Sequence, residues 1–172
     1  AQELEMPHID SGLIMRFFFY MSKHRIEDYD FTFNDKHLEF YVNGELIENN
    51  VLSDALAVEL SETGLTHSIR EKANTFLSSI INKYEKRGCI VSGRTMGKTI
   101  RNPIVRFYLT CPLEIRKKRR NYRVKDIENR DNFDSKRYSE SSIDIETITI
   151  DTSVNGVTDT ISSMKDIVAL LN

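Results

Sequence analysis

The sequence predicts an α/β fold with a mainly parallel sheet. Short apolar runs, typical of strands buried on both faces, alternate with longer segments whose apolar residues recur every three or four positions. Strands and helices that alternate in this way usually form a parallel sheet with helices on both faces. A length of 172 residues suits one domain, which at that size needs no disulfide or metal for stability.

The elements expected in the first half of the chain begin with the end of a helix. Residues 1–6 indicate the last turns of a helix that Pro7 stops, so we expect the natural chain to start earlier. Asp10 or Ser11 then caps a helix along the apolar stretch Leu13–Met21. The other expected elements are two short strands around Phe31–Phe33 and Leu38–Val42, a hairpin turn at Asn43-Gly44, and helices over Leu52–Leu60 and Thr66–Lys86.

The second half is expected to continue the alternation of strands and helices. Gly88 ends the preceding helix, and the apolar run Cys89–Val91 indicates a buried parallel strand. The further elements are a loop at Gly93–Gly97, a buried strand at Val105–Leu109, a basic helix over Leu113–Arg123, a strand at Ile145–Ile150 and an amphipathic helix over Val157–Leu170. Because ligands bind beyond the carboxyl ends of parallel strands, we expect ligand loops around Ser11, Arg94 and Arg116.

Composition excludes several classes of protein. The longest apolar run, Leu13–Met21, is interrupted by Arg16 and is far shorter than the ~18 residues that a membrane span needs. The two cysteines, Cys89 and Cys111, show no Cys-x-x-Cys pairing, which excludes a disulfide framework or zinc site and favours a reducing compartment. The four histidines lack the spacing of metal ligands. A net charge of −2 argues against binding of polyanions by the molecule as a whole.

Positive charge is nevertheless concentrated in one segment. Residues 116–137 carry ten Lys/Arg and four Asp/Glu, a local balance of +6, whereas the rest of the chain carries fourteen basic and twenty-two acidic residues, a balance of −8. Such a segment either faces phosphate groups or forms the solvated face of a helix, and charge alone leaves both interpretations open.

Seven short motifs carry more specific information. They are His8-Ile9-Asp10-Ser11-Gly12 with Arg16, Val42-Asn43-Gly44-Glu45, Ser61 with Ile69-Arg70-Glu71, Ser92–Gly97, Leu109–Arg120, Arg130–Arg137 and Ile150-Asp151-Thr152. Each motif alone has an ordinary explanation, such as a helix cap or a turn. Together, and in this order over almost the whole chain, they resemble the motifs of the bacterial-type cytidylate (CMP) kinases.

That resemblance implies a P-loop nucleoside monophosphate kinase-like fold, a parallel sheet with helices on both faces and a small insertion that binds the nucleoside monophosphate. The kinase-like core is expected at residues 1–28 and 61–172, the NMP-binding insertion at residues 29–60, and a shortened lid at residues 113–130 within the core. The family's activity is transfer of a phosphoryl group from ATP to CMP or dCMP, with Mg²⁺ between the phosphates.

The resemblance also implies a set of site residues rich in arginine, whose guanidinium pairs with two phosphate oxygens at once. The implied substrate-binding residues are Arg16, Arg94 and Arg137 for the acceptor phosphate, Ser61 and Arg70 for cytosine, Arg130 and Asp134 for the sugar, and Ser11 and Thr95 in the same pocket. The implied catalytic residues are Arg116, Arg119 and Arg120, at the start of the lid that closes over ATP.

Several departures from the family's pattern argue against catalysis. The 172 residues contain no Gly-x-x-x-x-Gly-Lys-[Ser/Thr] motif, so we expect the loop that cradles ATP phosphates, and the central strand before it, to be missing. Thr95 stands where the family has Asp, and a hydroxyl cannot supply the charge of a carboxylate. Only nine residues separate Arg120 from Arg130, which shortens the lid.

Two main hypotheses therefore stay open. In the first, the protein phosphorylates CMP or dCMP with ATP and Mg²⁺. In the second, it is a catalytically inactive protein of this fold, without cofactor, that serves as a structural subunit of a larger RNA-containing assembly such as a mitochondrial ribosome and contacts RNA through Arg116–Arg137. A third hypothesis is a sensor that binds CMP without turnover. The expected compartment is the cytoplasm or an organelle, with the mitochondrial matrix favoured under the second hypothesis.

Overall fold

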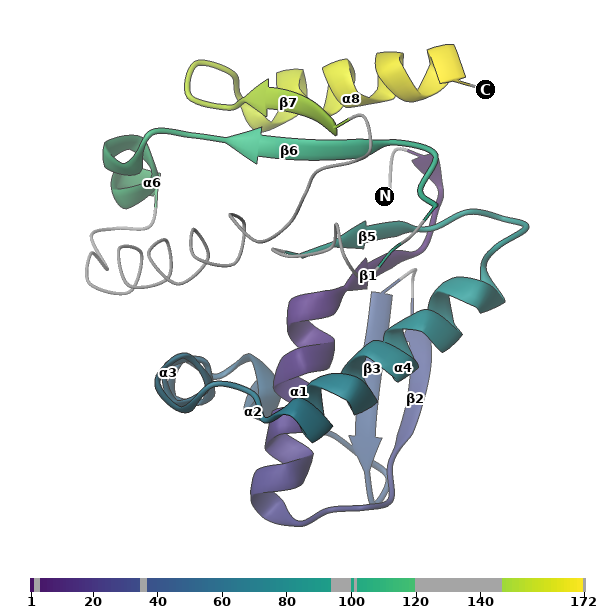
Figure 1. Ribbon diagram of the computed structural model, residues 1–172, viewed down its shortest axis with the longest axis vertical. Coiled ribbons are helices and arrows are strands. Elements are labelled where there is room, and N and C mark those ends of the chain that lie inside the picture. The colour runs from purple at the N-terminus through teal and green to yellow at the C-terminus, as the bar shows by residue number, and fades with distance from the viewer. Residues whose placement is uncertain (2–3, 35–36, 94–99, 101, 120–146, 172) are drawn as a thin grey trace. The chain divides into compact units, whose positions relative to one another are not determined.

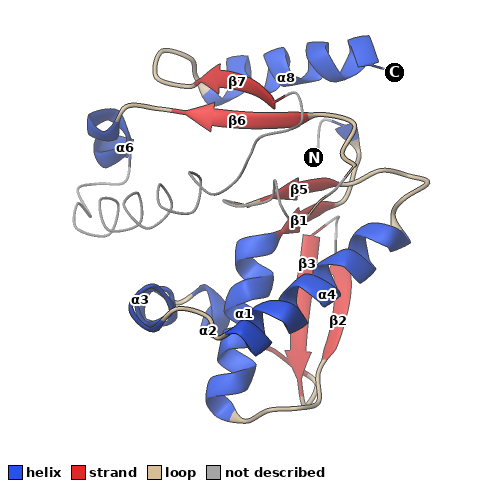
Figure 2. Cartoon of the chain, in the orientation of Figure 1, coloured by secondary structure: helices blue, strands red, loops and turns tan. Residues whose placement is uncertain are grey.

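The computed structural model describes residues 1, 4–34, 37–93, 100, 102–119 and 147–171 (Figure 1). The chain divides into two compact units, Ala1–Thr99 and Ile100–Asn172. Each unit combines helices with a pair of parallel strands, which confirms the α/β class (Figure 2). Among the helices described, none has both the length and the apolar character needed to cross a bilayer.

The first unit is built around helix α1 and two small sheets. Its elements are β1 (His8–Asp10), α1 (Ser11–His24), β2 (Asp30–Asn34), β3 (His37–Val42), β4 (Glu45–Leu46), α2 (Glu48–Leu52), α3 (Asp54–Thr63), α4 (His67–Lys83) and β5 (Ile90–Ser92). Strands β1 and β5 pair in parallel, whereas β2, β3 and β4 form an antiparallel sheet. Asp10 lies opposite Ser92, so both parallel strands end at the same edge, where α1 begins.

Helix α1 lies at the centre of this unit's hydrophobic core. Ile14 and Phe17 are fully buried on it. The ring of Phe17 stacks on Phe40 of β3 with centroids 3.8 Å apart, and Phe18 packs edge-on against Phe76 of α4 at 5.5 Å. Full burial of such a side chain stabilises a fold by about 1.5–3 kcal/mol. These contacts fix α1 between the antiparallel sheet and α4.

The start of α1 is set by Asp10, as the sequence predicted. The Asp10 carboxylate accepts hydrogen bonds from the backbone N–H groups of Gly12 and Leu13, at 2.8 and 3.2 Å, and so satisfies two donors that a helix start leaves unpaired. A Cβ atom at Gly12 would lie only 3.0 Å from Asp10 Oδ1, so glycine leaves room for this cap. The helix ends at Arg25, whose backbone is left-handed.

The predicted hairpin strands are also confirmed. Residues Phe31–Phe33 lie in β2 and residues Leu38–Val42 in β3, and Asn43-Gly44 forms the turn into β4. Both turn residues have positive φ angles, 52° and 79°, as a tight hairpin turn requires. The sequence signal was reliable here because the turn type restricts which residues can occupy it.

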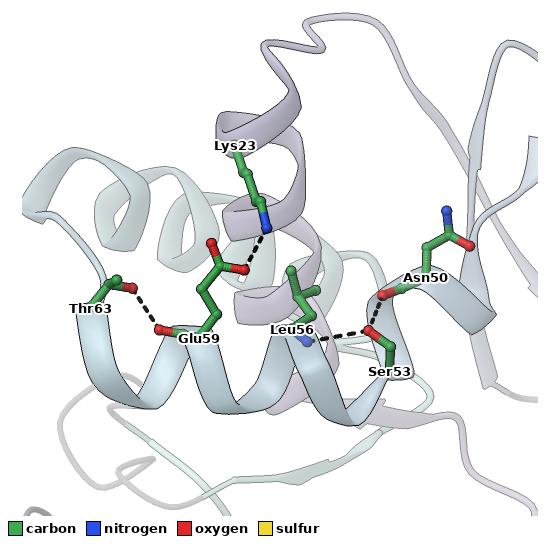
Figure 3. Close-up of polar contacts among 6 residues, drawn as sticks. All are labelled: Lys23, Asn50, Ser53, Leu56, Glu59 and Thr63. Atoms are coloured by element: carbon green, nitrogen blue, oxygen red, sulfur yellow. Dashed lines mark hydrogen bonds and ion pairs between the residues drawn. The ribbon is translucent and has the colours of Figure 1, made fainter.

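The helix expected over Leu52–Leu60 is two helices, α2 and α3. The backbone of Ser53, with ψ 139°, is not helical and breaks the segment. Its hydroxyl accepts the N–H of Leu56 at 3.3 Å and donates to Asn50 O at 2.9 Å, so the same side chain ends one helix and caps the next (Figure 3).

Helix α4 begins as predicted and ends earlier than predicted. Its cap is Thr66, but the helix stops at Lys83 rather than running to Gly88. Gly88, with φ 79°, instead closes the following turn by donating its N–H to Tyr84 O at 2.8 Å. Strand β1 was not predicted at all, because its single core residue, Ile9, is too little pattern to indicate a strand.

The second unit contains β6 (Arg106–Thr110), α6 (Leu113–Arg119), β7 (Thr147–Asp151) and α8 (Val157–Leu171). Strands β6 and β7 pair in parallel, with Thr110 opposite Asp151 at their carboxyl ends. The prediction that β6 is buried is wrong, since Tyr108 and Leu109 are 45% and 52% exposed. In the described part of the chain the strand has β7 as its one neighbour, which leaves much of it uncovered. Strand β5 is likewise only partly buried.

Candidate functional site

The site residues that the sequence predicts fall into two described groups. Ser11, Arg16, Ser61 and Arg70 lie in the first unit, and Arg116 and Arg119 lie in the second. The other predicted residues, Arg94, Thr95, Arg120, Arg130, Asp134 and Arg137, lie outside the described residues.

The first group begins where β1 and β5 end. Ser11, the first residue of α1, is only 3% exposed, and Asp10 beside it caps the helix. On the neighbouring strand, Ser92 Oγ lies 2.8 Å from His8 Nε2. The hydroxyls of Ser11 and Ser92 and the carboxylate of Asp10 thus lie at the carboxyl ends of the parallel strands, where α/β proteins bind ligands. The imidazole of His8 comes from the first residue of β1 and contacts Ser92.

The contact between His8 and Ser92 was not expected from the sequence. The two residues are 84 positions apart, and only the parallel pairing of β1 with β5 brings them together. No local pattern could have indicated it, because the histidines have no regular spacing.

Arg16 is the most informative residue of the first group. It lies on α1, five residues after Ser11. Its Nε is buried and has no hydrogen-bond partner among the described residues. Asn74 Oδ1 on α4 is likewise buried without a hydrogen-bond partner among these residues. Leaving a buried donor unpaired costs about 1–3 kcal/mol. The guanidinium of Arg16 therefore suits an acceptor that comes from a ligand.

Ser61 and Arg70 lie on consecutive helices. Ser61 is in the last turn of α3, and Arg70 is in the first turn of α4. The α4 cap, Thr66, accepts the N–H of Ile69 at 3.4 Å and fixes the start of the helix that carries Arg70. The Arg70 side chain is partly buried.

In the second group, both arginines tie α6 to the strand ends. Arg116 Nε donates to Cys111 O at 2.9 Å. Arg119 donates to the carbonyl oxygen of Thr152 and, at 3.3 Å, to its hydroxyl, and also lies 3.7 Å from Cys111 Sγ. The Thr152 hydroxyl in turn donates to Thr110 O at 3.0 Å. The guanidinium groups of Arg116 and Arg119 therefore donate these hydrogen bonds to residues of their own unit.

Asp151, the last residue of β7, adds a negative charge to this region. The backbone N–H of Ser153 donates to Asp151 Oδ1 at 2.8 Å. That bond, with the Ser153 side chain and the charge of Arg119, lowers the pKa of the Asp151 carboxyl, although slight burial opposes the change. Asp151 is therefore ionised at neutral pH and helps to hold Arg119 at the strand ends.

The described residues do not form a metal site. Within these residues, no group of three or more His, Cys, Asp or Glu side chains is placed to hold a metal ion. On α6, Lys117 pairs with Glu114 at 3.2 Å, so part of the basic charge of this helix is already balanced within the helix.

Comparison with known proteins identifies the family. The family model for cytidylate kinase matches residues 1–169. The chain belongs to the cytidylate kinase family. The cytidylate kinase of Aquifex aeolicus (strain VF5) is 29% identical over 140 residues, which cover 74% of this chain and 62% of that relative. The aligned chain thus spans somewhat less than two thirds of the relative's length.

Membership of the cytidylate kinase family confirms the resemblance that the seven motifs indicated. It also agrees with a mixed α/β fold that contains parallel strands. The name of the family describes kinases that act on cytidylate.

Proposed function

We propose that this chain binds CMP or dCMP and that Arg16 contacts the phosphate of the nucleotide. The observation that carries the proposal is the buried Nε of Arg16, which has no acceptor among the described residues. A phosphate supplies several acceptor oxygens and a negative charge, and a guanidinium can pair with two of those oxygens at once. Family membership supports cytidine as the nucleoside.

The other acceptor contacts are proposed from the resemblance to cytidylate kinases. Arg94 and Arg137 join Arg16 on the phosphate, and Ser61 with Arg70 faces the cytosine. The remaining contacts are Arg130 and Asp134 with the sugar, and Ser11 and Thr95 in the same pocket. Ser11 is supported by its burial at the end of β1, the usual position of a ligand site in an α/β fold.

The residues described here do not fit ATP and Mg²⁺ as they fit an anionic acceptor. They include no metal-binding cluster, and the 172 residues contain no Gly-x-x-x-x-Gly-Lys-[Ser/Thr] motif. Arg116 and Arg119, which the resemblance assigns to the lid, donate to Cys111 and Thr152. The proposed role of the chain's own residues is therefore to bind and orient the acceptor.

Calorimetry with CMP, cytidine and UMP tests the proposal. We expect CMP to bind at least about 10-fold more tightly than cytidine, because cytidine lacks the phosphate that forms charge-assisted hydrogen bonds. UMP should bind more weakly than CMP. Equal binding of CMP and cytidine, or binding of neither, would contradict a phosphate site at Arg16. A coupled assay for ATP-dependent turnover on the same protein separates a kinase from a protein that only binds the nucleotide.

A second candidate function is a non-catalytic subunit of an RNA-containing assembly. Thr95, in place of the family's Asp, favours it, because the substitution removes a carboxylate. The basic segment at residues 116–137 would contact the RNA backbone. Filter binding of a short RNA at two salt concentrations tests this role. We expect Arg119→Ala/Arg120→Ala to weaken binding at low salt, and unchanged binding would exclude RNA contact through these residues.

A further inference from the structure

An ion pair joins helix α3 to α1, and one of the described side chains of α3 is buried. Leu56 is the described α3 residue that is buried, at 5% exposure. Near the middle of α3, Glu59 Oε2 accepts a hydrogen bond from Lys23 Nζ of α1 at 2.5 Å (Figure 3). Because Leu56 is the one buried apolar side chain among those described on α3, we expect this helix to open more readily than the core helices, and the ion pair to contribute to its attachment.

The neighbouring helix α2 is held differently. Val51 of α2 is fully buried and belongs to the hydrophobic core, whereas Leu56 of α3 lies outside that cluster. Asn50 Nδ2 of α2 also donates to Tyr20 OH at 3.1 Å, one turn before Lys23 on α1. The junction at Ser53 is therefore anchored through α2, and the Lys23–Glu59 pair is a further contact that holds α3 on α1.

The ion pair connects two helices that both carry proposed substrate-binding residues. Arg16 lies on α1, seven positions before Lys23, and Ser61 lies on α3, two positions after Glu59. The proposed contacts of these residues are with opposite ends of the nucleotide, the phosphate and the base. The position of α3 on α1 thus sets the separation between the two contacts.

We propose that Lys23 and Glu59 are positioning residues for the acceptor nucleotide. Their ion pair holds α3 on α1 and so holds Ser61 at a fixed distance from Arg16. The inference rests on the proposed function, because Ser61 and Arg16 enter the site through it. It adds two residues that contact no ligand and that lie outside the seven motifs.

The expected effect is modest because the pair is partly exposed. The side chains of Lys23 and Glu59 are 42% and 36% exposed, so water and salt screen their attraction. Loss of an exposed pair of this kind corresponds to a change of about two- to five-fold in an equilibrium constant. We expect the CMP dissociation constant to rise by that factor when either partner is neutralised.

Three variants and one control test the pair. Lys23→Gln and Glu59→Gln should each weaken CMP binding in calorimetry by about two- to five-fold. Both should also speed amide hydrogen exchange across residues 54–63, without slowing or speeding exchange in α1. The charge-swapped double variant Lys23→Glu/Glu59→Lys should restore both properties. Lys83→Gln, which removes a lysine from the last turn of α4, should change neither.

The two measurements separate this inference from the proposed function. If the unaltered chain does not bind CMP, the proposed function fails, and α3 exchange in the two single variants still tests the ion pair. Unchanged exchange in both single variants would overturn the inference, whatever happens to CMP binding. The inference would also be overturned if Lys23→Gln weakened CMP binding while Glu59→Gln left it equal or made it tighter. That result would mean that Lys23 contacts the phosphate directly.

Discussion

Replacing Arg16 with methionine tests two proposed effects of its buried, unpaired guanidinium nitrogen. The first is a loss of stability in the unliganded protein, and the second is tighter binding of the phosphate of CMP. Methionine has a long, unbranched side chain that can occupy much of the same space on α1, and it has no N–H group. Arg16→Met therefore removes the unpaired donor and the positive charge together. We expect the unliganded protein to become more stable and the binding of CMP to become weaker.

The magnitudes follow from the hydrogen bonds that are gained and lost. An unpaired buried donor costs about 1–3 kcal/mol, and since the Arg16 side chain is only partly buried, we expect a gain near the lower end of that range. For a chain of this size, about 1 kcal/mol raises Tm by roughly 2–4 °C. Hydrogen bonds to a charged group contribute about 1.5–3 kcal/mol, so the CMP dissociation constant should rise by roughly 10- to 150-fold.

Urea unfolding without ligand and calorimetry with CMP and cytidine measure these effects. Arg16→Met should weaken CMP binding and leave cytidine binding unchanged, because only CMP carries the phosphate. Arg16→Lys is the matched control, since it keeps the charge without the planar fork and should give an intermediate affinity. A fall in the free energy of unfolding of Arg16→Met would refute the reasoning, because it would assign Arg16 a structural role. Unchanged affinity for CMP would also refute it.

Four further substitutions test the fold. Asp10→Ala removes the α1 cap and should lower the free energy of unfolding by about 0.5–2 kcal/mol in urea, whereas no loss would mean that water caps the helix equally well. Phe17→Ala should cost about 3–5 kcal/mol in the same assay, and a loss below about 1 kcal/mol would contradict its place in the core. Gly44→Ala should cost about 1–2 kcal/mol at φ 79°, and a neutral result would mean that the turn rearranges. The Asp151 carboxyl has a lowered pKa in the folded chain, so its stabilising effect is present at neutral pH and is lost as the pH falls through that pKa. The difference in the free energy of unfolding between the unaltered chain and Asp151→Asn should therefore shrink below about pH 4, and a difference that stays constant with pH would contradict this.

The parts of the fold that the sequence predicted well are those set by local interactions. Asp10 caps α1 as predicted, and α4 begins after Thr66, at the predicted start of that helix; the Asp10 cap depends on residues within a few positions. The turn at Asn43-Gly44 depends on two adjacent residues with positive φ angles. At the cap and at the turn, the residue types that stabilise the local structure are the same ones that predict it from the sequence.

The parts that the sequence missed depend on tertiary contacts. Strand β1 is defined by pairing with β5, about 80 residues away, and only Ile9 of it is buried. The apolar residues around Leu52–Leu60 fit one helix, yet Ser53 divides it in two. Strand β6 has the apolar run of a buried strand, but in the described part of the chain β7 is its one neighbour in the sheet, and the strand is partly exposed.

In the candidate site, too, features set by local sequence could be predicted and features set by tertiary packing could not. The motifs around Ser11 and Arg16 could be recognised from the order of residues alone, and the cytidylate kinase family is confirmed. The unpaired Nε of Arg16 depends on packing, so no pattern of residues indicates it. The pairing of Lys23 with Glu59, 36 positions away, also depends on how two helices meet.

Arg16 differs from Arg116 and Arg119 in its hydrogen bonds, and the difference bears on the proposed function. Arg116 and Arg119 donate to Cys111 and Thr152, so they stabilise their unit without a ligand. Arg16 has a buried N–H group without an acceptor among the described residues, and a donor left in that condition costs about 1–3 kcal/mol unless a ligand such as the proposed anion supplies the acceptor. A loss of turnover alone would not remove the cost of the unpaired donor, because that cost lowers the stability of the unliganded protein. A chain that had ceased to bind nucleotide would be more stable with an apolar residue at this position. Arginine at position 16 therefore favours a protein that still binds an anionic acceptor, whether or not it transfers a phosphoryl group.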